Sequence, residues 1–157
     1  MIKAENNASL LKRFNSYLDE QHMRHTPERD AIVRRVLNIT GHFTIEQLKQ
    51  MLDDDGFYVS KATIYNTVDL LMTLGILRRH CFEGLQAQYE KSNVPIHSHL
   101  ICTKCGKVKE VRDNNFIAFM NTRKFTAFTQ DYYSLCVYGV CNSCARKQKK
   151  KPKQLTP

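Results

Sequence analysis

Residues 60–89, SKATIYNTVDLLMTLGILRRHCFEGLQAQY, carry a clear helix signal followed by strand signals. Ser60 is a favoured N-cap residue, and apolar side chains then recur at helical spacing up to Gly75, a residue type that commonly ends helices. The run 76–82 and the alternating run 85–89 flank a Glu-Gly turn and have the pattern of paired strands. We therefore expect a helix followed by a β-hairpin.

Further helices are predicted upstream of this stretch. A first amphipathic helix carries Leu10, Phe14 and Leu18 at helical spacing. A second begins at Thr26-Pro27, where Thr is a good N-cap and Pro suits the first helical position. A third opens at 44–47, Thr-Ile-Glu-Gln, which fits a capping box. Of these four predicted helices, three, the last being the helix after Ser60, combine with the hairpin to make a winged helix-turn-helix. The helix after Ser60 is then the recognition helix.

The composition changes near residues 91–95, which we interpret as a hinge. Beyond it the sequence predicts a small α+β domain, and the expected elements are strands at 97–102 and 107–112, a helix at 114–125 and a strand at 132–138. The expected divisions are a winged-helix DNA-binding domain at 1–91, a hinge at 92–95, a second domain at 96–145 and a basic disordered tail at 146–157.

Charge and hydropathy limit the class of protein. The formal net charge is +9, but the last twelve residues hold six basic groups and no acid, which leaves 18 basic against 15 acidic residues elsewhere. Such a tail could attract phosphate or simply aid solubility. No apolar run has the length of about 18 residues that a membrane span needs, and the N-terminus lacks a secretory pattern. We expect a cytoplasmic protein.

Two Cys-x-x-Cys pairs, Cys102–Cys105 and Cys141–Cys144, are separated by 35 residues. Each tight turn can aim two thiolates at one point, and two such turns complete the tetrahedron that Zn²⁺ prefers. We predict a structural zinc. The alternatives are free thiols or a thioredoxin-like redox pair, but a redox pair normally occurs singly near a βαβ pattern, which is absent here. Cys81 and Cys136 are interpreted as ordinary half-buried residues, with redox or haem chemistry as the alternative.

A second metal site is predicted from imidazoles and carboxylates near the hinge. His97 and His99 are two apart on an expected strand, so both face one side, and Glu110 lies on the neighbouring strand. Glu90 ends the hairpin and His42 lies between the second and third helices. These ligand types suit Fe²⁺, Mn²⁺ or Zn²⁺. An ion bound by ligands from both domains would favour one interdomain angle and so couple metal occupancy to DNA affinity.

The chain resembles the ferric uptake regulator family from about residue 10 to 145. The stretches that carry the resemblance are RHTPER at 24–29, GHFT at 41–44, SKATIY at 60–65, FEG at 82–84, YE at 89–90, HSHLIC at 97–102, CGKV at 105–108 and YGVC at 138–141. The resemblance implies a homodimer, with domain 96–145 serving dimerisation. It also implies a metal-dependent repressor of A·T-rich palindromic operators, with the regulatory ion at His42, Glu90, His97, His99 and Glu110.

Three departures from the family pattern affect these expectations. Asn66 stands where many members carry Arg, so base readout can differ. The residues of a further family metal site are replaced, with Ser98 between the histidines and Tyr132-Tyr133 before the last strand, so we predict that site to be missing. Glu90 and Glu110 are glutamates where peroxide-sensing relatives tend to have aspartates, which disfavours peroxide sensing.

We expect the recognition helix to enter the major groove, where Tyr65 can contact thymine methyl groups and Asn66 can pair with adenine. Lys61 and the helix N-terminus suit phosphate. The full set of candidate DNA contacts is Lys61, Thr63, Tyr65, Asn66, Arg24, Arg78 and Arg79. Arg78 and Arg79 lie on the expected hairpin, and the alternative for them is a solvent-exposed strand edge without a DNA contact.

Two other functions compete with the metal-responsive repressor. A thiol- or haem-responsive DNA-binding sensor would use the same scaffold, with Cys81 or a Cys-x-x-Cys pair as reporter. A zinc hydrolase would use the His/Glu cluster, but no nucleophile, oxyanion donors or substrate pocket can be recognised, so we expect no enzyme.

Overall fold

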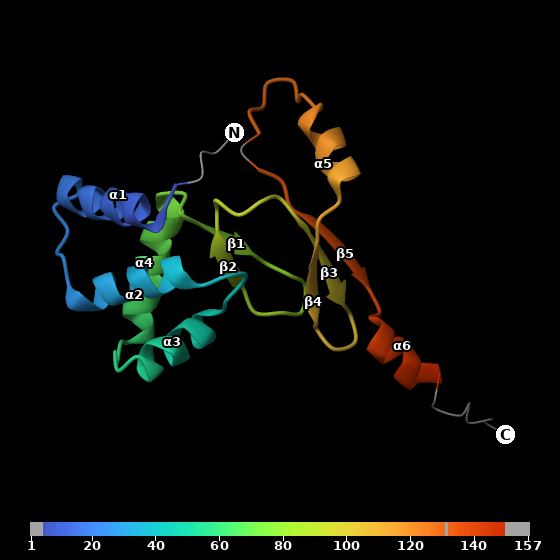
Figure 1. Ribbon diagram of the computed structural model, residues 1–157, viewed down its shortest axis with the longest axis horizontal. Coiled ribbons are helices and arrows are strands. Elements are labelled where there is room, and N and C mark those ends of the chain that lie inside the picture. The colour runs from blue at the N-terminus through green and yellow to red at the C-terminus, as the bar shows by residue number, and fades with distance from the viewer. Residues whose placement is uncertain (1–4, 131, 150–157) are drawn as a thin grey trace. The chain divides into compact units, whose positions relative to one another are not determined.

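The computed structural model describes residues 5–130 and 132–149 (Figure 1). The chain divides into two compact units, residues 1–94 and 95–157. The division falls within the segment expected to be the hinge.

The first unit opens with helices whose starts follow their capping residues. They are α1 (Asn7–Glu20), α2 (Pro27–Asn38), α3 (Ile45–Asp54) and α4 (Lys61–Thr73). The Thr26 side chain accepts a hydrogen bond from Arg29 N, as expected of an N-cap. At α3 both halves of the capping box are formed by Thr44 and Gln47. Local capping chemistry therefore fixes where these helices begin.

Helix α4 passes through the core of the first unit. Its side chains Ile64, Val68 and Leu71 are all fully buried, and each contributes about 1.5–3 kcal/mol on burial. The Ser60 side chain caps the N-terminus by accepting from Thr63 N. Gly75 follows the helix with φ +63°, a conformation that glycine adopts without strain. The buried face leaves the opposite face of α4 exposed.

A two-stranded wing follows α4. Strands β1 (Leu77–His80) and β2 (Gln88–Lys91) pair antiparallel, with Arg78 opposite Glu90. They are shorter than the expected 76–82 and 85–89, because the segment between them forms a turn containing Gly84 at φ +74°. An isolated bridge joins Phe43 to Tyr89, with N–H···O distances of 3.0 and 2.8 Å. This bridge ties the start of α3 to the wing and completes the winged helix-turn-helix.

The second unit is a small sheet with helices. Its elements are β3 (Ser98–Cys102), β4 (Val108–Val111), α5 (Asn114–Asn121), β5 (Leu135–Gly139) and α6 (Asn142–Lys149). The strand order is β4-β3-β5, antiparallel between β3 and β4 and parallel between β3 and β5. The α+β class and the winged helix followed by a small four-cysteine domain are as expected.

Several bounds in the second unit differ from expectation. Helix α5 ends at Asn121 and not near residue 125, since a turn follows in which Phe125 and Phe128 form an isolated bridge. Strand β5 begins at Leu135, three residues later than expected. Helix α6 was not expected, and it makes residues 146–149 of the predicted disordered tail helical. The rest of that predicted tail, 150–157, lies outside the described residues.

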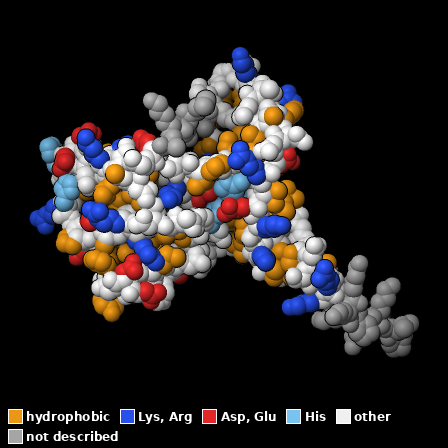
Figure 2. All heavy atoms as spheres, in the orientation of Figure 1, with side chains coloured by type: hydrophobic (Ala, Val, Ile, Leu, Met, Phe, Trp, Pro, Cys, Tyr) orange, Lys and Arg blue, Asp and Glu red, His pale blue; other side chains and the backbone are white. Residues whose placement is uncertain are grey.

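Apolar side chains remain exposed on the second unit (Figure 2). Leu100 on β3 and Val137 on β5 are 38% and 47% exposed and are register partners. Phe119 on α5 is also half exposed.

Across the described ranges, no helix combines the length and the hydrophobicity of a membrane span.

Candidate functional site

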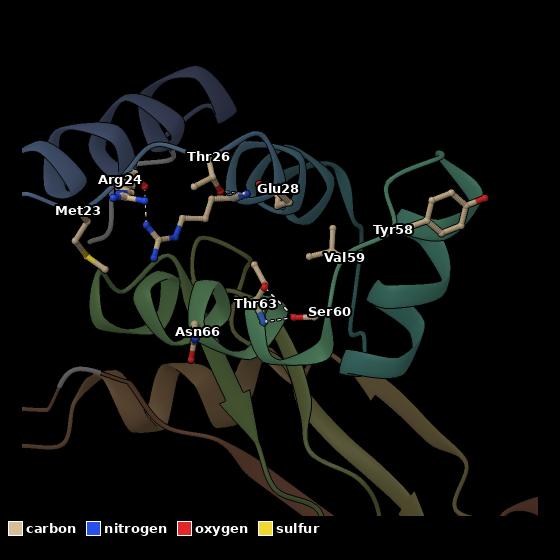
Figure 3. Close-up of a pocket in the computed structure, with 10 residues that line it drawn as sticks. Met23, Arg24, Thr26, Glu28, Tyr58, Val59, Ser60, Thr63 and Asn66 are labelled. Atoms are coloured by element: carbon tan, nitrogen blue, oxygen red, sulfur yellow. Dashed lines mark hydrogen bonds between the residues drawn. The ribbon is translucent and has the colours of Figure 1, made fainter.

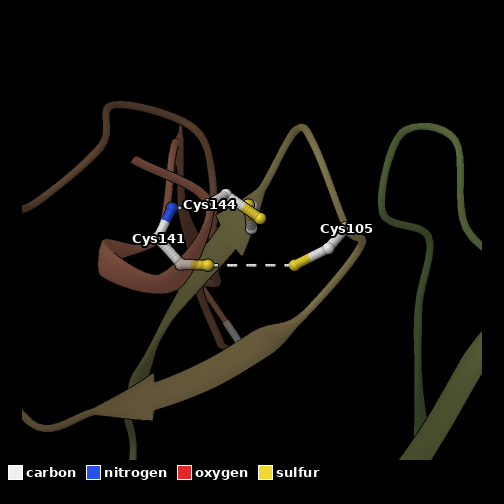
Figure 4. Close-up of side chains that lie close together, drawn as sticks. Cys105, Cys141 and Cys144 are labelled. Carbon is white, nitrogen blue, oxygen red and sulfur yellow. Dashed lines mark hydrogen bonds between the residues drawn. The ribbon is translucent and has the colours of Figure 1, made fainter. Parts of the chain in front are cut away.

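Four cysteines of the second unit come together at one end of its sheet. Cys102 ends β3, Cys105 follows a tight turn, Cys141 follows β5 and Cys144 lies on α6. One sulfur from each lies within 4.8 Å of the others, and Cys105 Sγ is 3.8 Å from Cys141 Sγ (Figure 4). Four converging thiols of two Cys-x-x-Cys pairs fit a tetrahedral structural Zn²⁺. The predicted cluster is therefore assembled.

Hydrogen bonds within this cluster shift the pKa values of its thiols. Cys141 N–H donates to Cys102 Sγ at 3.3 Å. This bond, together with the N–H groups of Lys104 and Cys105, lowers the pKa of the Cys102 thiol to about 6. The pKa of Cys144 is raised to about 12 by hydrogen bonds with Cys105 and Cys141. The cluster accommodates one thiolate readily and resists further negative charge, which a divalent cation would neutralise.

The two cysteines outside the pairs have different surroundings. Cys81 follows β1 and is exposed, whereas it was expected to be half-buried. Cys136 lies on β5, is half-buried, and its Sγ is 3.9 Å from Ser134 Oγ. Neither belongs to the four-cysteine cluster.

A second group of ligands lies within the first unit. His42 Nε2 is 3.5 Å from Glu90 Oε2, and His80 Nε2 is 2.7 Å from Glu90 Oε1. The bridge between Phe43 and Tyr89 places His42 and Glu90 side by side, because each directly adjoins a bridged residue. His80 was not among the predicted metal ligands, because it follows two arginines that were interpreted as DNA contacts.

Opposing effects act on the Glu90 carboxylate. Burial raises its pKa, but the hydrogen bond with His80 and the electrostatic effects of His42, Arg78 and His80 outweigh burial, so the net pKa is lowered. Glu90 therefore stays ionised. An ionised carboxylate between two imidazoles has the donors that Fe²⁺, Mn²⁺ and Zn²⁺ accept.

The second unit contributes its own imidazoles. The rings of His97 and His99 have centroids 4.7 Å apart, so both lie on one side, although His97 precedes β3. His97 Nδ1 lies 2.9 Å from the carbonyl oxygen of Pro95. Because a carbonyl only accepts, Nδ1 carries the proton and Nε2 is the atom suited to a metal. Glu110 pairs with His99 across β3 and β4, but it is in no cluster of close ligand atoms formed by the described residues.

The exposed face of α4 carries the predicted base-reading residues. Tyr65 is 44% exposed and Asn66 is exposed. Thr63 and Asn66 line an open depression of about 540 Å³, together with Arg24 and Tyr58 from the loops before α2 and α4 (Figure 3). Lys61 Nζ lies 3.4 Å from Glu46 Oε1. Polar and aromatic side chains thus gather around the N-terminus of α4.

The two wing arginines, Arg78 and Arg79, differ in burial. Arg78 is nearly buried and its guanidinium lies 3.2 Å from Ser92 O and 3.6 Å from Glu90 Oε1. Arg79 is exposed. Of the two, Arg79 is exposed to solvent, whereas Arg78 contacts Ser92 and Glu90 of its own unit.

Comparisons with known proteins give consistent matches. Residues 20–133 match the ferric uptake regulator family. A ferric uptake regulation protein of Campylobacter upsaliensis is 30% identical over 152 residues, which cover 90% of this chain and 93% of that protein. A peroxide-responsive repressor, PerR of Staphylococcus aureus, is 30% identical over 127 residues, 80% of this chain and 84% of that protein.

A solved structure shows the same fold. The ferric uptake regulator of Helicobacter pylori matches with a TM-score of 0.72 at 18% identity, covering 92% of this chain and 97% of that one. This likeness supports the arrangement of helices and strands described above.

Proposed function

This chain belongs to the ferric uptake regulator family of metal-responsive transcriptional regulators, and from that premise we propose that it is a dimeric repressor that binds its operator when its regulatory site holds a divalent metal. The observation that supports this proposal is the position of His42 Nε2 at 3.5 Å from Glu90 Oε2, within the unit that contains α4. We further propose that it acts in the cytoplasm, as expected of a regulator of this family.

The proposed DNA contacts centre on α4. Tyr65 and Asn66 are exposed on the face opposite the core, where Tyr can meet thymine methyl groups and Asn can pair with adenine. Thr63, Lys61, Arg24 and Arg79 supply further base or phosphate contacts. We assign Arg78 a supporting role within the unit. The A·T preference of the operator follows from family membership.

The proposed regulatory ion takes ligands from both units: His42 and Glu90 from the first, and His97, His99 and Glu110 from the second. Fe²⁺ and Mn²⁺ suit this mixture of imidazole and carboxylate, and Zn²⁺ is the third candidate. The structural Zn²⁺ occupies the four cysteines. An ion that binds both units lowers the free energy of one interdomain arrangement relative to the others. Metal binding can change DNA affinity only through this difference in free energy between arrangements.

The proposed dimer uses the second unit. Strand β5 is at an edge of its sheet and, together with β3, presents the exposed Leu100 and Val137. Burying such apolar surface against a second copy is favourable. A symmetric pair of recognition helices then matches a palindromic operator.

The test is a titration of operator binding with Fe²⁺, Mn²⁺ and Zn²⁺. His99→Ala should abolish the metal response while keeping the four-cysteine zinc. His25→Ala is the matched control, because His25 is an exposed histidine paired with Asp19 and should respond as the parent does. A parental response in His99→Ala would overturn the proposed site.

A thiol- or haem-responsive sensor is the competing function. It predicts that oxidation of Cys81 or added haem, and not a divalent ion, changes operator affinity. Because Cys81 is exposed, Cys81→Ser removes its thiol without changing the core, and the metal response of this variant can be compared directly with that of the parent. An unchanged metal response in Cys81→Ser supports the metal-responsive repressor.

A further inference from the structure

The wing brings a third possible metal ligand, His80, to the pair formed by His42 and Glu90. In the antiparallel register His80 stands opposite Gln88, two residues before Glu90 on β2. Residues at such diagonal positions share one face of a hairpin. The β-hairpin therefore directs His80 and Glu90 to the same side, where the bridge between Phe43 and Tyr89 also brings His42.

The three side chains converge on a small volume. The two oxygens of Glu90 each face one imidazole, at 2.7 Å from His80 Nε2 and 3.5 Å from His42 Nε2. The two rings meet edge to face with centroids 5.2 Å apart. One ligand atom from each residue lies within 4.8 Å of the other two. Small shifts of these side chains, in which the His80–Glu90 hydrogen bond opens, would place one atom of each at a coordinating distance of about 2.0–2.2 Å from one ion.

Neighbouring side chains hold this arrangement. The ring of Phe82 stacks on His80 with centroids 5.7 Å apart, and it also contacts His42 at 6.4 Å. Arg78 lies 3.6 Å from Glu90 Oε1, which places a positive charge near the carboxylate. Arg78 also donates to Ser92 O at 3.2 Å. It can keep this bond while the carboxylate turns to an ion.

We propose that His80 is a metal ligand, and that His42, His80 and Glu90 form a divalent-metal site complete within the first unit. Two histidines and one carboxylate with open positions are the ligand set characteristic of non-haem Fe²⁺. The inference rests on the proposed function, because the ion at these three residues is the proposed regulatory metal. It adds that the DNA-reading unit holds this ion through its own three ligands when those of the second unit are removed.

The experiment measures Co²⁺ binding directly, without DNA, on the full chain with zinc at the four cysteines. Co²⁺ bound to imidazole and carboxylate lacks the thiolate charge-transfer absorption of a cysteine site, so the two sites are spectrally distinct. The double variant His97→Ala/His99→Ala should still bind one Co²⁺ with this spectrum. Adding His80→Ala should weaken that binding by at least about 10- to 100-fold, since loss of even a supporting residue has that effect.

His80→Gln separates coordination from mere positioning. A glutamine can still donate a hydrogen bond to Glu90 but lacks the imidazole, so a ligand role predicts that it fails to restore the spectrum and affinity. Full restoration by His80→Gln, or unchanged Co²⁺ binding on adding His80→Ala, would overturn the inference and leave the proposed function standing. A parent chain that binds no Co²⁺ beyond the cysteine site would contradict both.

The controls use the same chain. His25→Ala, placed in the double variant, removes an exposed histidine outside the cluster and should leave Co²⁺ affinity unchanged. Zinc content and the thermal unfolding midpoint of each variant show that the fold is intact. If His80→Ala does not fold, His80→Gln carries the comparison alone.

Discussion

At the scale of single residues, Asn66 gives a direct test of DNA reading. It is exposed on α4, where its amide can form paired hydrogen bonds with adenine. We expect Asn66→Ala to weaken operator binding by about 1–3 kcal/mol, or about 5- to 150-fold, because those bonds are lost. Fluorescence anisotropy at fixed salt and saturating metal measures the change.

The control for Asn66 is Asn121→Ala, which removes an exposed amide at the end of α5 in the second unit. Its operator affinity should equal that of the parent. Equal losses in both variants, or none at Asn66, would show that the amide on α4 does not read the operator.

The candidate site residues differ in how far the sequence could predict them. Cys102, Cys105 and their partner pair were predictable because ligand spacing within a tight turn is a local property. His80 was not, because its role depends on the hairpin register that places it beside Glu90. The partners of Arg78 were not predictable for the same reason: its sequence neighbours indicate an exposed basic run, but Glu90 lies opposite it on the neighbouring strand.

At the scale of elements, the capping box of α3 supports the segment that carries His42. Thr44 Oγ1 accepts from Gln47 N at 3.2 Å and Gln47 Oε1 accepts from Thr44 N at 2.8 Å. We expect Thr44→Ala to lower the free energy of unfolding by about 0.5–2 kcal/mol, because an N–H at the helix start loses its partner. Urea unfolding followed by circular dichroism measures this.

Thr44→Ser is the matched variant, since it keeps the hydroxyl. It should retain most of the stability that Thr44→Ala loses. If both substitutions cost the same, the lost methyl group and not the cap explains the effect, and this account of how α3 begins is wrong.

The elements were predictable where signals are local. Caps at Thr26, Thr44 and Ser60 correctly placed the starts of three helices. The parallel pairing of β3 with β5 was not predictable, because those strands are far apart in the sequence and no turn connects them directly. Helix α6 was hidden by its basic composition, which is equally typical of a tail.

At the scale of the whole molecule, zinc connects folding to assembly. The four cysteines join the end of β3 to the segment after β5, so zinc binding contributes directly to folding of the second unit. We expect Cys141→Ser to lose about one zinc per chain and to dissociate the dimer, while the helical circular dichroism of the first unit persists. Metal analysis and analytical ultracentrifugation measure both effects.

Cys81→Ser is the control, because Cys81 is exposed and lies outside the cluster. It should keep both zinc and the dimer. A Cys141→Ser protein with parental zinc content and assembly would show that the four thiols do not form the structural site.

Metal-dependent DNA binding is tested by comparing the operator affinity of the wild-type chain in two states. In one, the regulatory metal has been removed and the cysteine zinc retained; in the other, Fe²⁺ or Mn²⁺ has been restored. We expect tight, specific binding only after restoration, with an affinity difference of about 5- to 150-fold between the states, the usual range of coupling between two sites. Equal affinity in both states would contradict metal-dependent DNA binding.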